Sequence, residues 1–291
     1  MAKNQTENQT LNAQEEFEKL IADLPFEQQQ ELRRLSGMDN VNKGEALPVL
    51  KVNTQLDADK KGVEIKHGNF VINQVVKFNS TTKETELENA GTDLGQEVEV
   101  IIYAAPQQYS KYDPDPKKRC NSQLLFDSSD APVGNTYGFN CRSGECPYRQ
   151  EGVADKEKCG CQVVAYMQLV SDGTKVMSYH KKSNFMPMSN YLKSLGTLKP
   201  FMVKTKLARK KEKNGNVTYY VVTPERGEPI SGIAMKETLQ IALETVQGIK
   251  AFEAQRASKN TTQIAYSPRN NSSATDATFS NSTDVEDIQF D

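Results

Sequence analysis

All five cysteines of this 291-residue chain lie between positions 120 and 161. Twenty residues separate Cys120 from Cys141, four separate Cys141 from Cys146, twelve follow before Cys159, and one more precedes Cys161. Two ligands a few residues apart, followed by a loop and a further ligand pair, are typical of a zinc ribbon. Thiolates prefer a soft cation, and four of them suit the tetrahedral geometry of zinc. The spacing therefore predicts a Zn²⁺ site in a loop over about 120–161.

Five thiols compete for four ligand positions, so the spacing alone leaves the fourth ligand open. Cys120, Cys141 and Cys146 have no close competitor, whereas Cys159 and Cys161 cannot both be required. We expect Cys161, because it heads a strand that would set its direction, with Cys159 as the alternative. A site closed by four cysteines is structural, since no position remains for water or substrate. The competing interpretation is a set of free cysteines, or disulfides in an oxidising compartment.

Three central segments are rich in β-branched and aromatic residues, and turn residues separate them: 62–78, 97–105 and 161–170. The clearest hairpin covers 200–225, where Asn214-Gly215 supplies the positive φ angles of a tight turn. Helical periodicity appears before and after this region, so we predict a mainly β fold with flanking helices (α+β). The economical architecture is an OB-like open β-barrel that carries the cysteine-rich loop.

The chain divides into three parts by composition. Residues 1–44 read as a helical or disordered arm, and 45–256 as the OB-like domain, which ends in a helix at about 232–256. That helix is predicted from apolar residues spaced four and three apart: Met235, Leu239, Ala242, Val246 and Ile249. Residues 257–291 are rich in Ser, Thr and Asn and read as a disordered acidic tail.

The overall charge of -2 conceals a segregation along the chain. Residues 1–40 hold four basic and eight acidic side chains, and 257–291 hold two basic and five acidic ones. The part between them holds 30 basic and 25 acidic side chains, a balance of +5. A basic body between acidic ends favours a polyanionic ligand.

Basic and aromatic residues interleave in three places, which is the combination that single-strand binding needs: cations for phosphates and rings for bases. In the hairpin, alternation places Lys204, Lys206 and Lys210 on one face while Val203, Thr205 and Leu207 occupy the other. The competing interpretation is a solvated charged face with ordinary core aromatics. The residues predicted to contact nucleic acid are Lys204, Lys206, Arg209, Lys210, Tyr219 and Tyr220 in the hairpin, Tyr109, Tyr112, Lys117, Lys118 and Arg119 before the first cysteine, and Lys181, Lys182 and Phe185.

The sequence argues against an enzyme. Neither of the two histidines, His67 and His180, lies beside a candidate nucleophile, and no phosphate-cradling glycine motif is present. No apolar run is long enough to cross a membrane, and the N-terminus lacks the apolar core of a secretory signal. We therefore expect a non-catalytic protein of a reducing cytoplasm with no membrane partner.

The last eight residues, DVEDIQFD, combine acidic and apolar side chains. Carboxylates can steer such a tip to a basic rim while the apolar pair fills a pocket, so we predict a protein-recruiting peptide. A merely solubilising tail is the alternative. The predicted partner-binding residues are Asp284, Glu286, Asp287, Ile288 and Phe290.

These features together resemble the single-stranded DNA-binding proteins of tailed phages. The likeness lies in LPVLKVN (47–53) followed by GNFVIN (68–73), in the cysteine loop with its Cys-Pro pair, and in the acidic tip. The resemblance implies an OB-type core with a zinc-binding insertion, a role in phage DNA replication or recombination, and a location in the cytoplasm of an infected bacterium. The N-terminal helices and the 232–256 helix have no counterpart in that family.

We therefore predict a sequence-tolerant single-stranded DNA-binding protein whose tip recruits replication or transcription proteins. One alternative is a zinc-containing transcription factor that contacts RNA polymerase, and another is a strand-annealing recombination protein. The oligomeric state stays open.

Overall fold

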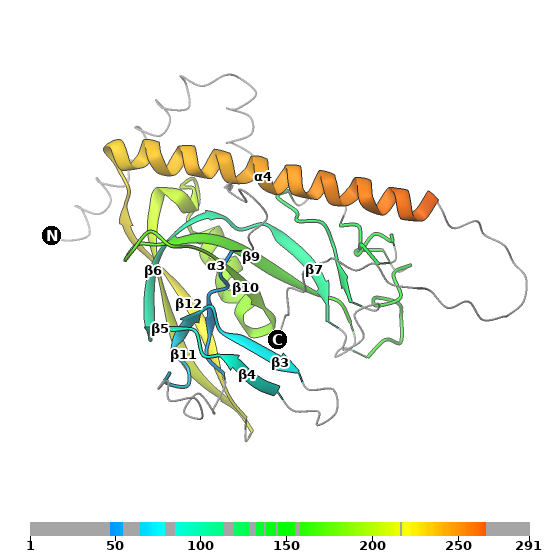
Figure 1. The fold of residues 1–291 in the computed structure, drawn as a ribbon, viewed down its shortest axis with the longest axis horizontal. Helices are drawn as coiled ribbons and strands as arrows, with labels where there is room; N and C mark the ends of the chain where they lie inside the picture. Colours follow the sequence, from blue (N-terminus) through cyan, green and yellow to red (C-terminus); the bar gives the residue numbers. More distant parts are fainter. Residues whose placement is uncertain are drawn as a thin grey trace, which may run out of the picture.

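The computed structural model describes residues 47–54, 65–78, 85–112, 119–127, 132–136, 138–143, 145–154, 158–215 and 217–265, of which 76–78, 85–86, 217 and 256–265 are described by the course of the chain alone. Antiparallel β-structure dominates them (Figure 1). The predicted mainly β fold is therefore confirmed, and the described residues include two α-helices. The predicted arm over 1–44 lies outside the described residues.

The main sheet has seven antiparallel strands in the order β12-β11-β6-β9-β7-β8, with β10 on the other edge of β9. β6 pairs with one half of β9, and β7 continues along the same edge with the other half. The described sheets do not close on one another as a barrel would. The strands of the main sheet are β6 (Glu97–Ala104), β7 (Gln107–Lys111), β8 (Cys120–Asn121), β9 (Gly160–Leu169), β10 (Lys175–Lys181), β11 (Val203–Asn214) and β12 (Val217–Pro229).

Two small sheets lie beside the main one. The first has the order β1-β2-β5, and the second pairs β3 with β4. Their strands are β1 (Lys51–Val52), β2 (Phe70–Ile72), β3 (Val75–Phe78), β4 (Thr85–Asn89) and β5 (Thr92–Gly95).

The predicted hairpin is confirmed as β11 and β12, which pair from Asn214↔Val217 back to Val203↔Pro229. Gly215 has a φ of 59°, the left-handed conformation that glycine adopts at little steric cost. Only Lys204–Ala208 of β11 pairs with β6, so the rest of the hairpin extends past that strand.

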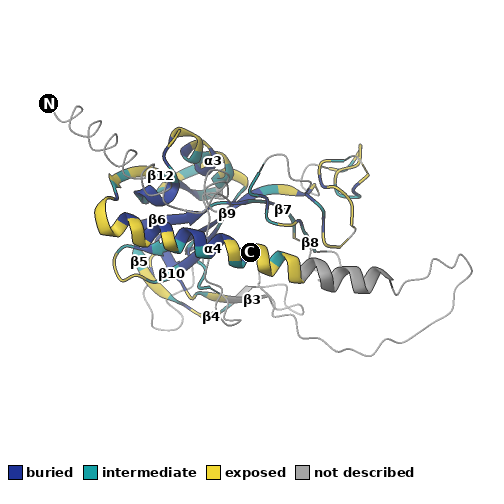
Figure 2. Cartoon of the chain, turned by 90° about the horizontal axis from the view of Figure 1, so that it is seen from above, coloured by how far each residue is buried: buried dark blue, intermediate teal, exposed yellow. Residues whose placement is uncertain are grey.

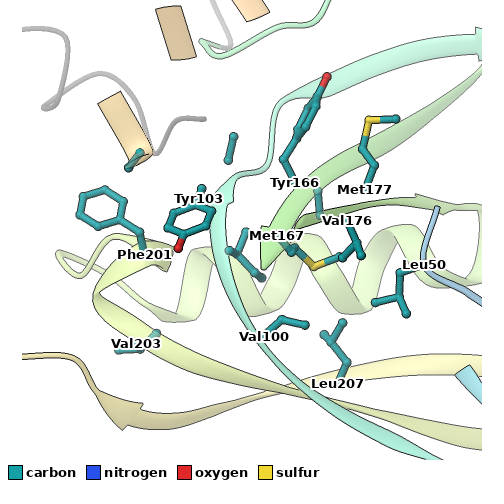
Figure 3. Close-up of a cluster of buried hydrophobic side chains, with 14 of the residues drawn as sticks. Leu50, Val100, Tyr103, Tyr166, Met167, Val176, Met177, Phe201, Val203 and Leu207 are labelled. Atoms are coloured by element: carbon teal, nitrogen blue, oxygen red, sulfur yellow. The ribbon is translucent and has the colours of Figure 1, made fainter. Parts of the chain in front are cut away.

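The core lies where β6, β9 and β11 meet. Val100, Met167 and Leu207 come from these three strands and are fully buried, and Figure 3 shows their side chains together with those of Leu50 and Val176. Continuous apolar runs in β6 and β9 are explained by this central position, because neighbouring elements cover them.

The C-terminal helix α4 (Gly232–Ala265) runs along one side of the molecule and packs against β6 (Figure 1). Its exposed and buried positions alternate around the axis, as Figure 2 shows. The predicted apolar face is confirmed, since Met235, Leu239, Ala242, Val246 and Ile249 are all buried. The predicted end at about 256 is wrong, because the helix continues to Ala265. The expected disordered tail therefore cannot begin at 257.

A second helix, α3 (Phe185–Ser194), lies between two 3₁₀ turns, η4 (Lys182–Asn184) and η5 (Pro200–Met202), and was not predicted. Pro187 occupies its first turn, where the missing N–H has no intrahelical partner in any case. Among the described residues, no helix combines the length and the apolar character that crossing a membrane requires.

Candidate functional site

Strand pairing brings the separated ends of the cysteine loop together. Cys120 in β8 lies opposite Lys111 of β7, and Gly160 at the start of β9 lies opposite Ser110 of the same strand. Because β7 pairs with both strands, it holds Cys120 and Cys159 at one end of the sheet. The loop between them brings Cys141 and Cys146 to the same end of the sheet, and all four cysteines are buried.

Gly134 makes room for two of these sulfur atoms. A Cβ at this position would lie 2.9 Å from the Sγ of Cys120 and 3.5 Å from the Sγ of Cys141. The loop is fastened at the same point, because the Gly134 N–H donates to the Phe139 carbonyl and the Gly138 N–H donates to the Gly134 carbonyl. A larger residue here would overlap the Sγ of Cys120.

The four thiols influence one another electrostatically. Burial, together with a smaller contribution from the neighbouring cysteines of the cluster, raises the pKa of Cys141 to about 11 and that of Cys159 to about 12. Several thiolates can therefore share this space only with a cation among them. In the described part of the chain, no three cysteine, histidine or carboxylate side chains already stand in a metal-holding arrangement, so ligation requires the thiols to turn toward a common centre.

Cys161 does not belong to this cluster, and the preference for it as the fourth ligand needs correction. Its Sγ lies 3.8 Å from Gln107 Oε1, and the charges that act on it are those of Arg142 and Arg149 rather than other cysteines. Cys161 lies within β9, where pairing with Tyr109 sets the direction of its side chain. The structure therefore favours Cys159, the alternative, as the fourth member.

Cations lie over tyrosine rings along β7 and the cysteine loop. The guanidinium of Arg149 lies 5.2 Å from the ring centroid of Tyr109, and Lys111 Nζ lies 5.6 Å from that of Tyr148. Each contact joins β7 to the loop, one with the cation on the loop and one with the cation on the strand. We name these residues and one further pair the tyrosine–cation face: Tyr109, Lys111, Tyr112, Arg119, Tyr148 and Arg149.

The third pair of this face stands next to the first cysteine. Arg119 lies 5.0 Å from the ring centroid of Tyr112, and the Tyr112 side chain is 44 % exposed. Tyr109 and Lys111 are two residues apart on one strand, so they share a face of the sheet, while Tyr112 and Arg119 lie just beyond the paired ends of β7 and β8. Tyr109 and Tyr148 are partly buried and Tyr112 is exposed. Rings with adjacent cations are the chemistry that accepts stacked bases and phosphates.

The lysines predicted to contact nucleic acid in the hairpin are paired with glutamates. The predicted alternation is confirmed, since Val203, Thr205 and Leu207 are buried while Lys204 and Lys206 are half-buried on the other face. Lys204, however, lies 3.0 Å from Glu228 and 4.0 Å from Glu99, Lys206 lies 2.7 Å from Glu97, and Lys210 lies 3.0 Å from Glu212. Hydrogen bonds to these carboxylates raise the pKa of Lys204 and of Lys206. The expected cationic stripe is a face of mixed charge.

Tyr220 is also engaged within the protein. It is 9 % exposed, its hydroxyl lies 3.3 Å from His67 Nδ1, and Arg209 lies 4.8 Å from its ring centroid. Gly68 stands directly against the ring, where an added Cβ would lie 2.7 Å from Tyr220 Cε1. Base stacking on Tyr220 would have to displace these contacts.

The remaining predicted contacts fall elsewhere. The Tyr219 hydroxyl donates to Glu212 at 3.1 Å, Lys182 is exposed in η4, and Phe185 packs against the main core. Lys181 lies opposite Gln162, which lies opposite Gln108, so it points to the other face of the sheet from Tyr109. Lys117, Lys118 and the partner-binding tip (Asp284, Glu286, Asp287, Ile288 and Phe290) lie outside the described residues.

Sequence reasoning missed Tyr148 and Arg149. They follow Cys146-Pro147 directly, so an aromatic–basic pair beside an expected ligand was the available signal. What the local pattern could not reveal is that both side chains reach back to β7.

Comparisons with protein-family models, with curated proteins and with solved structures find no match.

Proposed function

We propose that this chain is a non-enzymatic, sequence-tolerant single-stranded DNA-binding protein that binds DNA through the tyrosine–cation face. The observation that carries the proposal is the alternation of Tyr109, Tyr112 and Tyr148 with Lys111, Arg119 and Arg149 on β7 and the cysteine loop. Rings accept bases of any sequence because every base has a π-face, and the cations neutralise phosphates. Duplex DNA keeps its bases stacked internally, so this surface favours a single strand.

The cysteine cluster has the donor set of a structural zinc site. Cys120, Cys141, Cys146 and Cys159 would hold Zn²⁺, and the cradle at Gly134 leaves room for two of the sulfurs. When bound, the metal supplies a cross-link between β8, the start of β9 and the loop. Tyr148 and Arg149 lie two and three residues after Cys146, so the cross-link would fix them beside β7.

We also propose that the antiparallel sheet and its inserted loop form an open, OB-like core that binds single strands. The path of β6 and β7 supports it, because the two strands run consecutively along one edge of β9 and the tyrosine–cation face begins on the second of them.

Binding is tested by titrating a fluorescent oligo-dT and the matching duplex at two salt concentrations. We expect salt-sensitive binding of the single strand and much weaker binding of the duplex. Tyr109→Ala should weaken single-strand binding by about 1–3 kcal/mol with little change in salt dependence. Tyr219→Ala is the matched control, because Tyr219 bonds Glu212 on the hairpin and should leave the affinity unchanged. Equal affinity for duplex and single strand, or equal losses in both variants, would refute the assignment.

The acidic tip is proposed to recruit a replication or transcription protein. It carries four negative charges and no positive one, with Ile288 and Phe290 as its large apolar side chains. Deleting 284–291 should abolish partner capture while DNA binding stays intact or tightens. Phe290→Ala should remove capture and keep the charge, and markedly weaker DNA binding after the deletion would place the tip in the DNA site instead.

A further inference from the structure

Arg149 contacts both halves of the candidate site. Its guanidinium lies over the ring of Tyr109, and its Nη1 donates to the carbonyl oxygen of Cys159 at 3.4 Å. One side chain therefore joins a member of the cysteine cluster to a ring of the tyrosine–cation face.

We infer that Arg149 is a positioning residue that couples metal occupancy of the cysteine cluster to the nucleic-acid affinity of the Tyr109 ring. The inference rests on the proposed function and deepens it, because it makes the metal a regulator of the binding surface. It concerns Arg149 in particular and not the general need for a folded loop.

The coupling follows from geometry. A metal held by Cys159 would fix the main chain at this residue, whose carbonyl oxygen accepts a hydrogen bond from Arg149. Arg149 is then held over Tyr109, which fixes the ring in the orientation that a base meets. Without the metal, the main chain at Cys159 is less constrained, and Arg149 and Tyr109 gain freedom that DNA binding must then remove.

A second arginine of the loop provides a matched control. Arg142 follows Cys141 directly and is exposed, its charge acts on Cys161, which lies outside the cluster, and it is not part of the tyrosine–cation face. If the loop merely needed a positive charge, Arg142 and Arg149 would act alike. If coupling runs through the contacts with Cys159 and Tyr109, only Arg149 transmits it.

Thermodynamic linkage makes the effect reciprocal. If bound metal raises the affinity for DNA, bound DNA must raise the affinity for metal by the same factor. We would measure Zn²⁺ affinity by competition with a chromophoric chelator, with and without saturating oligo-dT, in the full-length chain. We expect oligo-dT to tighten Zn²⁺ binding at least about fivefold in the unmodified protein. Arg149→Ala should abolish that shift, Arg149→Lys should retain part of it, and Arg142→Ala should leave it unchanged.

A second readout needs no DNA. In protein with ¹³C-labelled tyrosine rings, the Tyr109 signal, assigned with Tyr109→Phe, should move on addition of one equivalent of Zn²⁺ and stay in place in Arg149→Ala. An unmoved Tyr109 signal, an absence of Zn²⁺ binding, or a full oligo-dT shift in Arg149→Ala would overturn the inference. A moving Tyr109 signal in a chain that does not bind oligo-dT would instead refute the proposed function and leave the link between Arg149 and the cluster standing.

Discussion

The Nζ of Lys206 lies 2.7 Å from Oε2 of Glu97, across the boundary between β11 and β6. The neighbouring Lys204 is bracketed in the same way by Glu228 and Glu99. A phosphate that approached these lysines would have to displace a carboxylate and would meet four glutamates on the strands around them, since Glu225 also faces Lys206. These lysines are therefore already neutralised, whereas on β7 and the cysteine loop cations accompany tyrosine rings.

The salt dependence of DNA binding should separate the two surfaces. Replacing Lys111 with Ala should lower the slope of log affinity against log salt by about 0.7, the value for one phosphate contact on a single strand. The Lys204→Ala/Lys206→Ala double variant should leave the slope unchanged, because both cations are already neutralised. Fluorescence titrations with oligo-dT at several salt concentrations give the slopes, and a larger loss in the double variant would return the interface to the hairpin.

Metal content should distinguish the two competing cysteines. Cys159→Ser should lose bound zinc and lower the free energy of unfolding, because Cys159 is buried among the other three thiols. Cys161→Ser should keep about one zinc per chain, since its thiol lies beside Gln107. Elemental analysis of protein purified without chelators measures both. Zinc lost from Cys161→Ser and kept in Cys159→Ser would reverse the assignment.

Gly68 should tolerate no side chain. It has a φ of +89°, and a Cβ there would overlap the ring of Tyr220. Gly68→Ala should therefore lower the free energy of unfolding by about 3 kcal/mol, from backbone strain and steric overlap together. Gly196 has a φ of +61° and open space around it, so Gly196→Ala should cost only about 1 kcal/mol. Urea unfolding compares the two variants. Equal losses in the free energy of unfolding would show that the contact with Tyr220 does not affect stability.

His180 should make stability depend on pH. It is fully buried within β10, and burial lowers its pKa from the ordinary 6.5 to about 4. A folded-state value below the unfolded one means that protonation favours the unfolded chain, so stability is present above pH 6.5 and is lost as the pH falls toward 4. Between about pH 7 and about pH 5 the imidazole should account for a loss of about 2 kcal/mol.

The control for His180 is a side chain of similar size that does not titrate. His180→Gln should lower stability at neutral pH but should show a smaller further loss on acidification than the unmodified protein. Urea unfolding at the two pH values gives the difference directly. Parallel pH profiles would assign the acid sensitivity to other groups.

Local patterns in the sequence were sufficient for much of the fold. The β-rich runs identified β6 and β9, Asn214-Gly215 identified the hairpin, and the apolar period identified the buried face of α4 from Met235 to Ile249. These signals are local, because alternation and helical period are properties of consecutive residues. The clustering of cysteines likewise marked the loop that the structure folds into one buried group.

Tertiary structure alone decided which of these side chains meet. Cys159 joins the cluster and Cys161 does not, because pairing with Tyr109 on β7 sets the direction of Cys161. Lys206 is neutralised by Glu97, which comes from a strand far earlier in the chain, and Arg149 reaches Tyr109 only because β7 lies between β8 and β9. A lysine in a strand has the same local pattern whether its neighbour across the sheet is a glutamate or solvent, so only the order of the strands determines which cations are free to meet a ligand.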